Sequence, residues 1–165
     1  MKLVSIAIMS LFFFGGCTST VVKDLKSYLG YDEETLLSLK KGVISEKGDT
    51  KATIQAIYLN SVDKEYGEGE NFFVAVYIAD DFDESKNYGL RNPRYTLLLN
   101  EKKALKITEL DENSDLRKKM PLKSRWNHYY HLLFEKSDMN ELKLTFKNHE
   151  GFKSELVYQK EKPQR

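Results

Sequence analysis

The residue with the most distinctive chemistry is Cys17, because it is the only cysteine in the chain. An intramolecular disulfide is therefore impossible, and a lone cysteine in an exported protein must be modified, paired with a second chain or left reactive. Gly15 and Gly16 stand directly before it. Small residues before such a cysteine fit a processing site, so we expect Cys17 to be modified rather than to be a buried free thiol.

The segment before Cys17 has the pattern of a secretory signal peptide. Lys2 supplies a positive charge, and residues 3–14 are apolar apart from two serines. A helix of that length would span about 18 Å, well short of a hydrocarbon core of about 30 Å. We therefore predict a cleaved signal peptide over residues 1–16.

The stretch Phe14-Gly15-Gly16-Cys17 resembles the lipobox of bacterial lipoproteins, with a departure at Phe14, where that family prefers Leu, Val or Ile. The resemblance implies that the signal peptidase recognises Phe14, Gly15 and Gly16, and that Cys17 carries diacylglycerol on its sulfur and an acyl chain on its new amine. Two or more chains anchor a protein stably in a membrane. Thr18 follows, whereas Asp at that place retains enteric lipoproteins in the inner membrane. The resemblance thus implies an outer-membrane lipoprotein that faces the periplasm.

Residues of types that bind metal ions occur in two places at spacings that could form a metal site. His128 and His131 are three residues apart, and on a strand this odd spacing sends them to opposite faces, so we predict no shared zinc ion.

The second place is an acidic stretch, in which Asp111, Asn113 and Asp115 repeat the start of a calcium loop. The pattern then fails, since Leu116 stands where glycine is needed and Leu122 where glutamate should close the loop. We therefore interpret these residues as turn formers, with calcium binding as the alternative.

Composition and the absence of known motifs argue against several classes of function. The chain has 26 basic and 25 acidic residues, so no strongly basic face is implied and nucleic acid is a poor partner. The sequence contains no G-x-S-x-G, H-E-x-x-H, P-loop or dinucleotide motif. We therefore predict a non-catalytic protein without a cofactor.

Period-two alternation of apolar residues predicts the elements that position these groups. The seven predicted strands span residues 53–60, 71–79, 95–100, 104–110, 126–135, 142–147 and 152–159. The second of them is apolar on both faces, as expected of a central strand covered on both sides. This pattern favours a mainly β fold, an immunoglobulin-like antiparallel β-sandwich of about seven strands, with an eight-stranded barrel as the alternative closure.

A short helix is expected before the strands. Asp32 can cap its start, the last turn holds Lys40 and Lys41, and Gly42 can terminate it. The predicted organisation is a signal peptide (1–16), a lipidated tether with the helix (17–50), the β-sandwich (51–160) and a polar tail (161–165).

Residues 126–135 hold the only tryptophan beside several other rings. Alternation places Trp126 with the core and turns Tyr129 and His131 outward, where aromatic rings make good interface anchors. The same alternation turns Leu105 and Ile107 inward.

These features predict a lipid-anchored envelope protein that binds another envelope protein. Residues 54–60 and 73–78, separated by a glycine-containing loop, resemble the first two strands of the type VI secretion outer-membrane lipoprotein. That resemblance implies a membrane-spanning partner docked on the loop 61–71, which makes Tyr66 a candidate contact beside Tyr129 and His131. An envelope enzyme inhibitor and a carrier of an apolar ligand are the alternatives.

Overall fold

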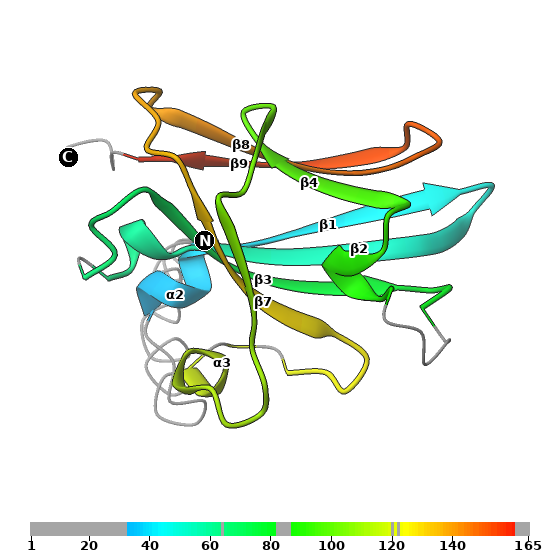
Figure 1. Ribbon diagram of the computed structural model, residues 1–165, viewed down its shortest axis with the longest axis horizontal. Helices are drawn as coiled ribbons and strands as arrows, with labels where there is room; N and C mark the ends of the chain where they lie inside the picture. The colour runs from blue at the N-terminus through cyan, green and yellow to red at the C-terminus, as the bar shows by residue number, and fades with distance from the viewer. Residues whose placement is uncertain (1–32, 64, 82–86, 120, 122, 161–165) are drawn as a thin grey trace, which may run out of the picture. The chain divides into compact units, whose positions relative to one another are not determined.

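The computed structural model describes residues 33–63, 65–81, 87–119, 121 and 123–160 (Figure 1). The predicted signal-peptidase and lipidation residues Phe14, Gly15, Gly16 and Cys17, together with the polar tail 161–165, lie outside the described residues.

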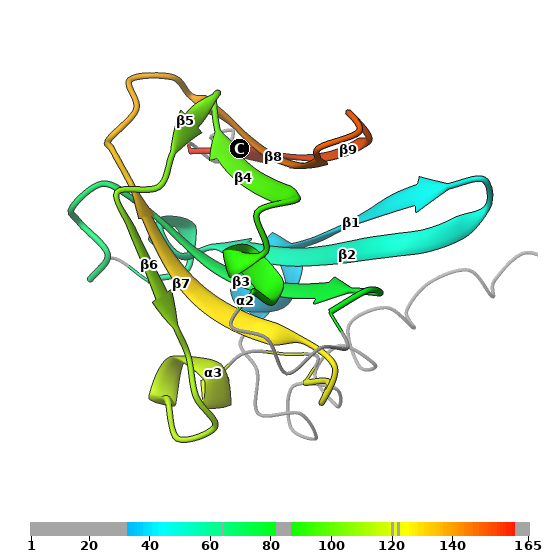
Figure 2. The ribbon, with the colours of Figure 1, turned by 45° about the vertical axis from the view of Figure 1, so that its right-hand side comes forward.

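The described part is mainly β and forms two antiparallel sheets, which confirms the prediction of a mainly β fold with the architecture of a β-sandwich (Figures 1 and 2). One sheet has five strands and the other four, and both hairpins β1–β2 and β2–β3 lie in the larger sheet. In sheet order, the five-stranded sheet holds β1 (Leu39–Glu46), β2 (Asp49–Tyr58), β3 (Glu70–Ile78), β7 (His128–Phe134) and β6 (Lys106–Glu109).

The smaller sheet lies over one face of the larger one (Figure 2). All seven predicted strands are present, and β1 and β5 are additional. In sheet order, the four-stranded sheet holds β5 (Lys102–Lys103), β4 (Tyr95–Leu99), β8 (Glu141–Asn148) and β9 (Lys153–Gln159); the helical elements are α2 (Glu33–Ser38), η1 (Leu59–Ser61), η2 (Gly89–Arg91) and α3 (Asp115–Lys119).

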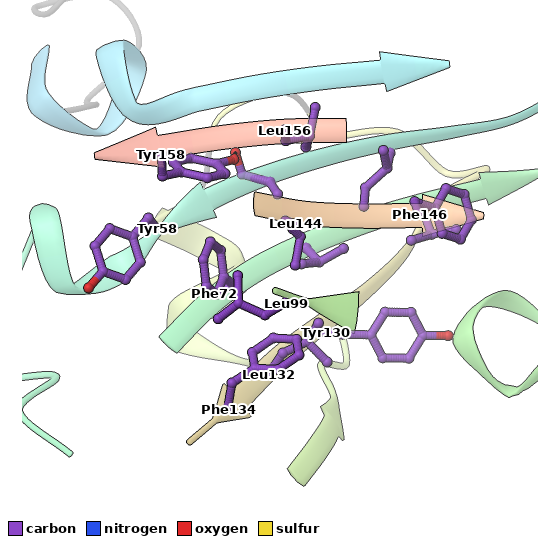
Figure 3. Packing of buried hydrophobic residues seen from close by; sticks show 14 of the residues in the cluster. Tyr58, Phe72, Leu99, Tyr130, Leu132, Phe134, Leu144, Phe146, Leu156 and Tyr158 are labelled. Carbon is purple, nitrogen blue, oxygen red and sulfur yellow. Dashed lines mark hydrogen bonds between the residues drawn. The ribbon is translucent and has the colours of Figure 1, made fainter. Parts of the chain in front are cut away.

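The core fills the space between the two sheets (Figure 3). Alternate residues of β2 and β3, such as Ile54 and Val74, point inward and are completely buried. Large rings from both sheets, including Phe72, Phe146 and Tyr158, belong to the same cluster. A buried side chain of this size contributes about 1.5–3 kcal/mol, so this cluster is the main source of stability.

The opposite, outer face of the five-stranded sheet carries a second, smaller cluster. It contains Ile57, Phe73, Ala75 and Tyr129, all at the alternate positions of their strands. Strand β3 is therefore covered on both faces over most of its length, as its sequence predicts.

The helix is shorter than the sequence predicts. It ends at Ser38, and the next residues, including Lys40, Lys41 and Gly42, belong to β1. Pairing of β1 with β2 over its full length outweighs the local helix-end signal. A Cβ atom at Gly42 would overlap the Ser154 hydroxyl, so this glycine permits β9 to approach. The sandwich thus begins at residue 39 rather than at 51.

Three residues predicted to lie in the core are exposed. Leu105 and Ile107 are more than half exposed because they lie at the β6 edge, beyond the smaller sheet. Trp126 is 57% exposed because β7 begins only at His128, so the alternation does not extend to it.

Candidate functional site

The loop between β2 and β3 is held by two asparagine side chains. Asn60 Nδ2 donates to Gly69 O at 2.9 Å and also to Tyr66 O, while Asn60 Oδ1 accepts from Asn71 N at 2.7 Å. Asn71 Nδ2 donates in turn to Glu68 O at 3.0 Å. These bonds tie the backbone at Tyr66, Glu68 and Gly69 to the two asparagines that flank the loop.

The structure brings Tyr66 and His131 together on the outer face of the sheet. Their ring centroids are 5.8 Å apart in an edge-on arrangement, and His131 Nε2 lies 3.0 Å from Asn71 Oδ1. Burial, and secondarily the charge of Lys106, lowers the pKa of His131. Both effects favour the neutral form of the imidazole, so the Tyr66 ring packs against a mainly uncharged partner.

Three exposed carboxylates, on Asp63, Glu65 and Glu68, belong to the same loop as Tyr66. Burial raises the pKa of the Tyr66 phenol, and the charges of Asp63 and Glu65 raise it further. We call Asp63, Glu65, Tyr66, Glu68 and His131 the loop patch.

Tyr129 does not belong to the loop patch, and its predicted outward exposure is wrong. The residue is on the outer face, but it is 2% exposed because the α3 segment covers it. The Arg117 guanidinium lies 4.4 Å from the ring centroid, and the phenol donates to Ser124 O at 3.0 Å. Tyr129 therefore holds the α3 segment on the sheet and has no free surface to offer a partner.

The acidic stretch after β6 acts as a set of turn formers. Asp111 Oδ1 accepts from the backbone N–H groups of Asn113 and Ser114, each at 2.9 Å. Asp115 lies at the start of α3, 3.4 Å from Lys118 Nζ. No group of three or more metal-ligating side chains occurs within the described residues.

The two histidines of β7 point to opposite faces, as their spacing predicts. His131 meets Tyr66 on the outer face, whereas the ring centroid of His128 lies 4.5 Å from that of Tyr88, with the two ring planes tilted by 31°.

A second surface, which the sequence prediction missed, is an open hollow of about 370 Å³ on the outer face of the five-stranded sheet. We call this surface the Trp126 hollow. Its described lining residues are Thr53, Gln55, Tyr77, Ser124, Trp126 and Asn127.

The alternation of side chains along β2 and β3 is the sequence feature that could have indicated the hollow. Thr53 and Gln55 on β2 and Tyr77 on β3 occupy the positions opposite the inward ones, and the polar character of the first two marks an accessible part of that face. Because alternation predicted Trp126 in the core, this residue was not expected to line a surface hollow.

Comparison of the chain with protein-family models, with curated proteins and with solved structures finds no match. Among the described residues, no helix has the length and apolar character needed to cross a membrane.

Proposed function

We propose that this protein is a non-catalytic lipoprotein of the bacterial envelope whose β-sandwich binds another envelope protein through the loop patch. The observation that carries the proposal is the contact of Tyr66 with His131 above a loop whose backbone Asn60 and Asn71 hold in place. A binding loop that is already ordered loses little conformational entropy when its partner docks.

The chemistry of the loop patch indicates the type of partner surface. Tyrosine is enriched among the residues that dominate binding energy at protein interfaces. The exposed carboxylates of Asp63, Glu65 and Glu68 would steer a basic surface toward it. The partner is thus expected to present lysine or arginine side chains around an apolar depression that accepts the Tyr66 ring.

Lipidation at Cys17 is the proposed source of membrane attachment, and the outer membrane is the proposed location. Anchoring confines the sandwich to a layer next to the bilayer, which raises its effective concentration toward a partner in the same membrane. The narrower version of this proposal is a component of a type VI secretion apparatus, because the loop patch occupies the segment that the family resemblance implies for docking.

The carrier alternative receives less support from the packing. The space between the sheets is filled by rings and aliphatic side chains of the core cluster, including Phe72 and Phe146 (Figure 3). An apolar ligand would have to displace these groups at a cost of several kcal/mol.

Site-directed crosslinking in whole cells tests the proposal. A photoreactive phenylalanine derivative replaces Glu65 in the loop patch or, as a control, Glu150 in the β8–β9 turn; both positions are exposed. We expect one stoichiometric envelope protein to crosslink from position 65 only, and Tyr66→Ala to reduce its yield about tenfold or more. Equal products from both positions, or a yield that Tyr66→Ala leaves unchanged, would contradict it.

A further inference from the structure

We propose that the Trp126 hollow is a binding site for a neutral oligosaccharide. It lies on the same sheet face as the loop patch but at the other end of the strands, since Tyr77 is four residues along β3 from Phe73, the register partner of His131. Four residues of a strand correspond to about 13 Å. The two proposals are therefore independent.

The sheet register forms the floor of the hollow. Thr53 of β2 and Tyr77 of β3 are direct cross-strand partners, and Gln55 is the next residue of β2 on the same face. Ser124, Trp126 and Asn127, from the segment that leads into β7, form a wall. The volume of about 370 Å³ lies within the range of about 300–1,000 Å³ that is usual for small-molecule sites.

The lining combines two aromatic rings with four uncharged hydrogen-bonding side chains. Two of these side chains, on Gln55 and Asn127, are amides that each donate and accept. A sugar ring has the complementary character, because its hydroxyl groups donate and accept while its C–H faces can lie on the electron-rich face of an indole or phenol ring. The described lining residues are all of uncharged types, and the Arg125 guanidinium beside the hollow lies against the Trp126 ring, so the lining offers hydrogen bonds and ring faces of the kind that a neutral sugar uses.

Trp126 is positioned before any ligand arrives. The Arg125 guanidinium lies 4.6 Å from its ring centroid, and the backbone N–H of Trp126 donates to Ser124 Oγ at 3.2 Å. Trp126 remains 57% exposed, so much of its ring is accessible to a ligand. The contact with Arg125 reduces the freedom of the ring, so its exposed part can serve as a stacking surface at a lower entropic cost.

The sheet geometry disfavours a peptide that binds by adding a strand. Such a peptide needs an unpaired strand edge, but β2 lies between β1 and β3, and β3 lies between β2 and β7. Recognition at the hollow must therefore use side chains alone. A proline-rich peptide, which can dock on aromatic side chains, is the competing ligand that the experiment must distinguish.

Intrinsic fluorescence offers a direct test, since Trp126 is the only tryptophan in the chain. The mature protein, kept in detergent micelles, is titrated with chitotetraose, cellotetraose and maltotetraose, and separately with a decaproline peptide. We expect a saturable change in emission with at least one saccharide, at a Kd of about 1 mM or tighter. No saturable change with any of the three, or saturation by decaproline alone, would overturn the proposal.

Variants of the lining residues test whether the fluorescence change reports binding at the Trp126 hollow. Gln55→Ala retains the fluorophore and should weaken binding about fivefold or more, the usual effect of removing one hydrogen-bonding side chain. Trp126→Ala, followed by calorimetry, should abolish binding. Phe152→Ala removes an exposed ring in the β8–β9 turn and should leave the affinity unchanged. Because all three residues are partly exposed, the unfolding temperatures should match the parent; an affinity unaffected by Gln55→Ala would overturn the proposal.

Discussion

Lys160 and Glu70 form an ion pair with Nζ and Oε1 2.5 Å apart, although neither residue stood out in the sequence. The Glu70 side chain is 3% exposed and also accepts from the Tyr58 phenol at 2.6 Å and from Ser137 N at 2.8 Å. Lys160 Nζ donates further to Ser137 O. One carboxylate thus joins the start of β3 to β2, to the β7–β8 connection and to the residue after β9.

We predict that Glu70→Gln lowers the free energy of unfolding by about 3 kcal/mol, because it breaks an ion pair whose carboxylate is buried and leaves the partly buried Lys160 without its anion. Lys160→Met should cost a comparable amount, since it leaves the Glu70 carboxylate, which is 3% exposed, with only the neutral donors of Tyr58 and Ser137. In a double-mutant cycle measured by urea unfolding, the two effects should not add, and additive effects would show that the two charges are not coupled.

The same carboxylate predicts a pH dependence of stability. Burial alone would raise the pKa of Glu70, but the bonds from Lys160, Tyr58 and Ser137 outweigh it and hold the pKa below the ordinary value. A carboxyl group with a lowered folded-state pKa stabilises the protein above its unfolded pKa of about 4.5, and this contribution disappears as the pH falls through the folded value.

Urea unfolding of the parent and of Glu70→Gln between pH 7 and pH 3 measures this contribution. The difference in stability between the two proteins should be constant near neutral pH and should shrink below about pH 4.5. A difference that stays constant down to pH 3 would exclude this role of the carboxylate.

Gly69, in the loop that carries the loop patch, can be compared with Gly48 in the β1–β2 turn as a control for backbone strain. Both have a positive φ, of 71° and 92°, but a Cβ atom at Gly69 would overlap Phe134 O, whereas at Gly48 it would meet nothing within 4 Å. Gly48→Ala should cost only the backbone strain, about 1 kcal/mol. Gly69→Ala should cost clearly more and should also reduce crosslinking from position 65. Equal costs in thermal unfolding would refute the predicted overlap.

Lipidation is tested by Cys17→Ala in cells grown on labelled palmitate. The parent should carry the label and migrate as the mature form, whereas the variant should remain an unlabelled precursor, because both the acceptor sulfur and the cleavage position are lost. Thr18→Ala, one residue later, is the control and should mature normally. Label on the Cys17→Ala protein would rule out the lipobox interpretation.

Local pattern was sufficient for seven of the nine strands in the described residues, because alternation reflects which side of a strand meets apolar side chains. The inward positions Ile54, Val74 and Phe146 are all buried as their spacing predicts. The same rule failed at the ends of elements. Gly42 resembled a helix terminator but lies in β1, and Trp126 was assigned to a strand that begins two residues later.

The sequence by itself determined the class of fold, the inward face of strands such as β2, β3 and β8, and the prediction that Cys17 is lipidated, because each depends on residues close together in the chain. Only the tertiary structure decided that Tyr66 meets His131, that Tyr129 is covered, that Gln55, Tyr77 and Trp126 share a hollow, and that Lys160 reaches Glu70. These contacts join residues that are distant in the chain, so they depend on strand order and on how loops cover a sheet, and hydrophobic periodicity carries no information about either.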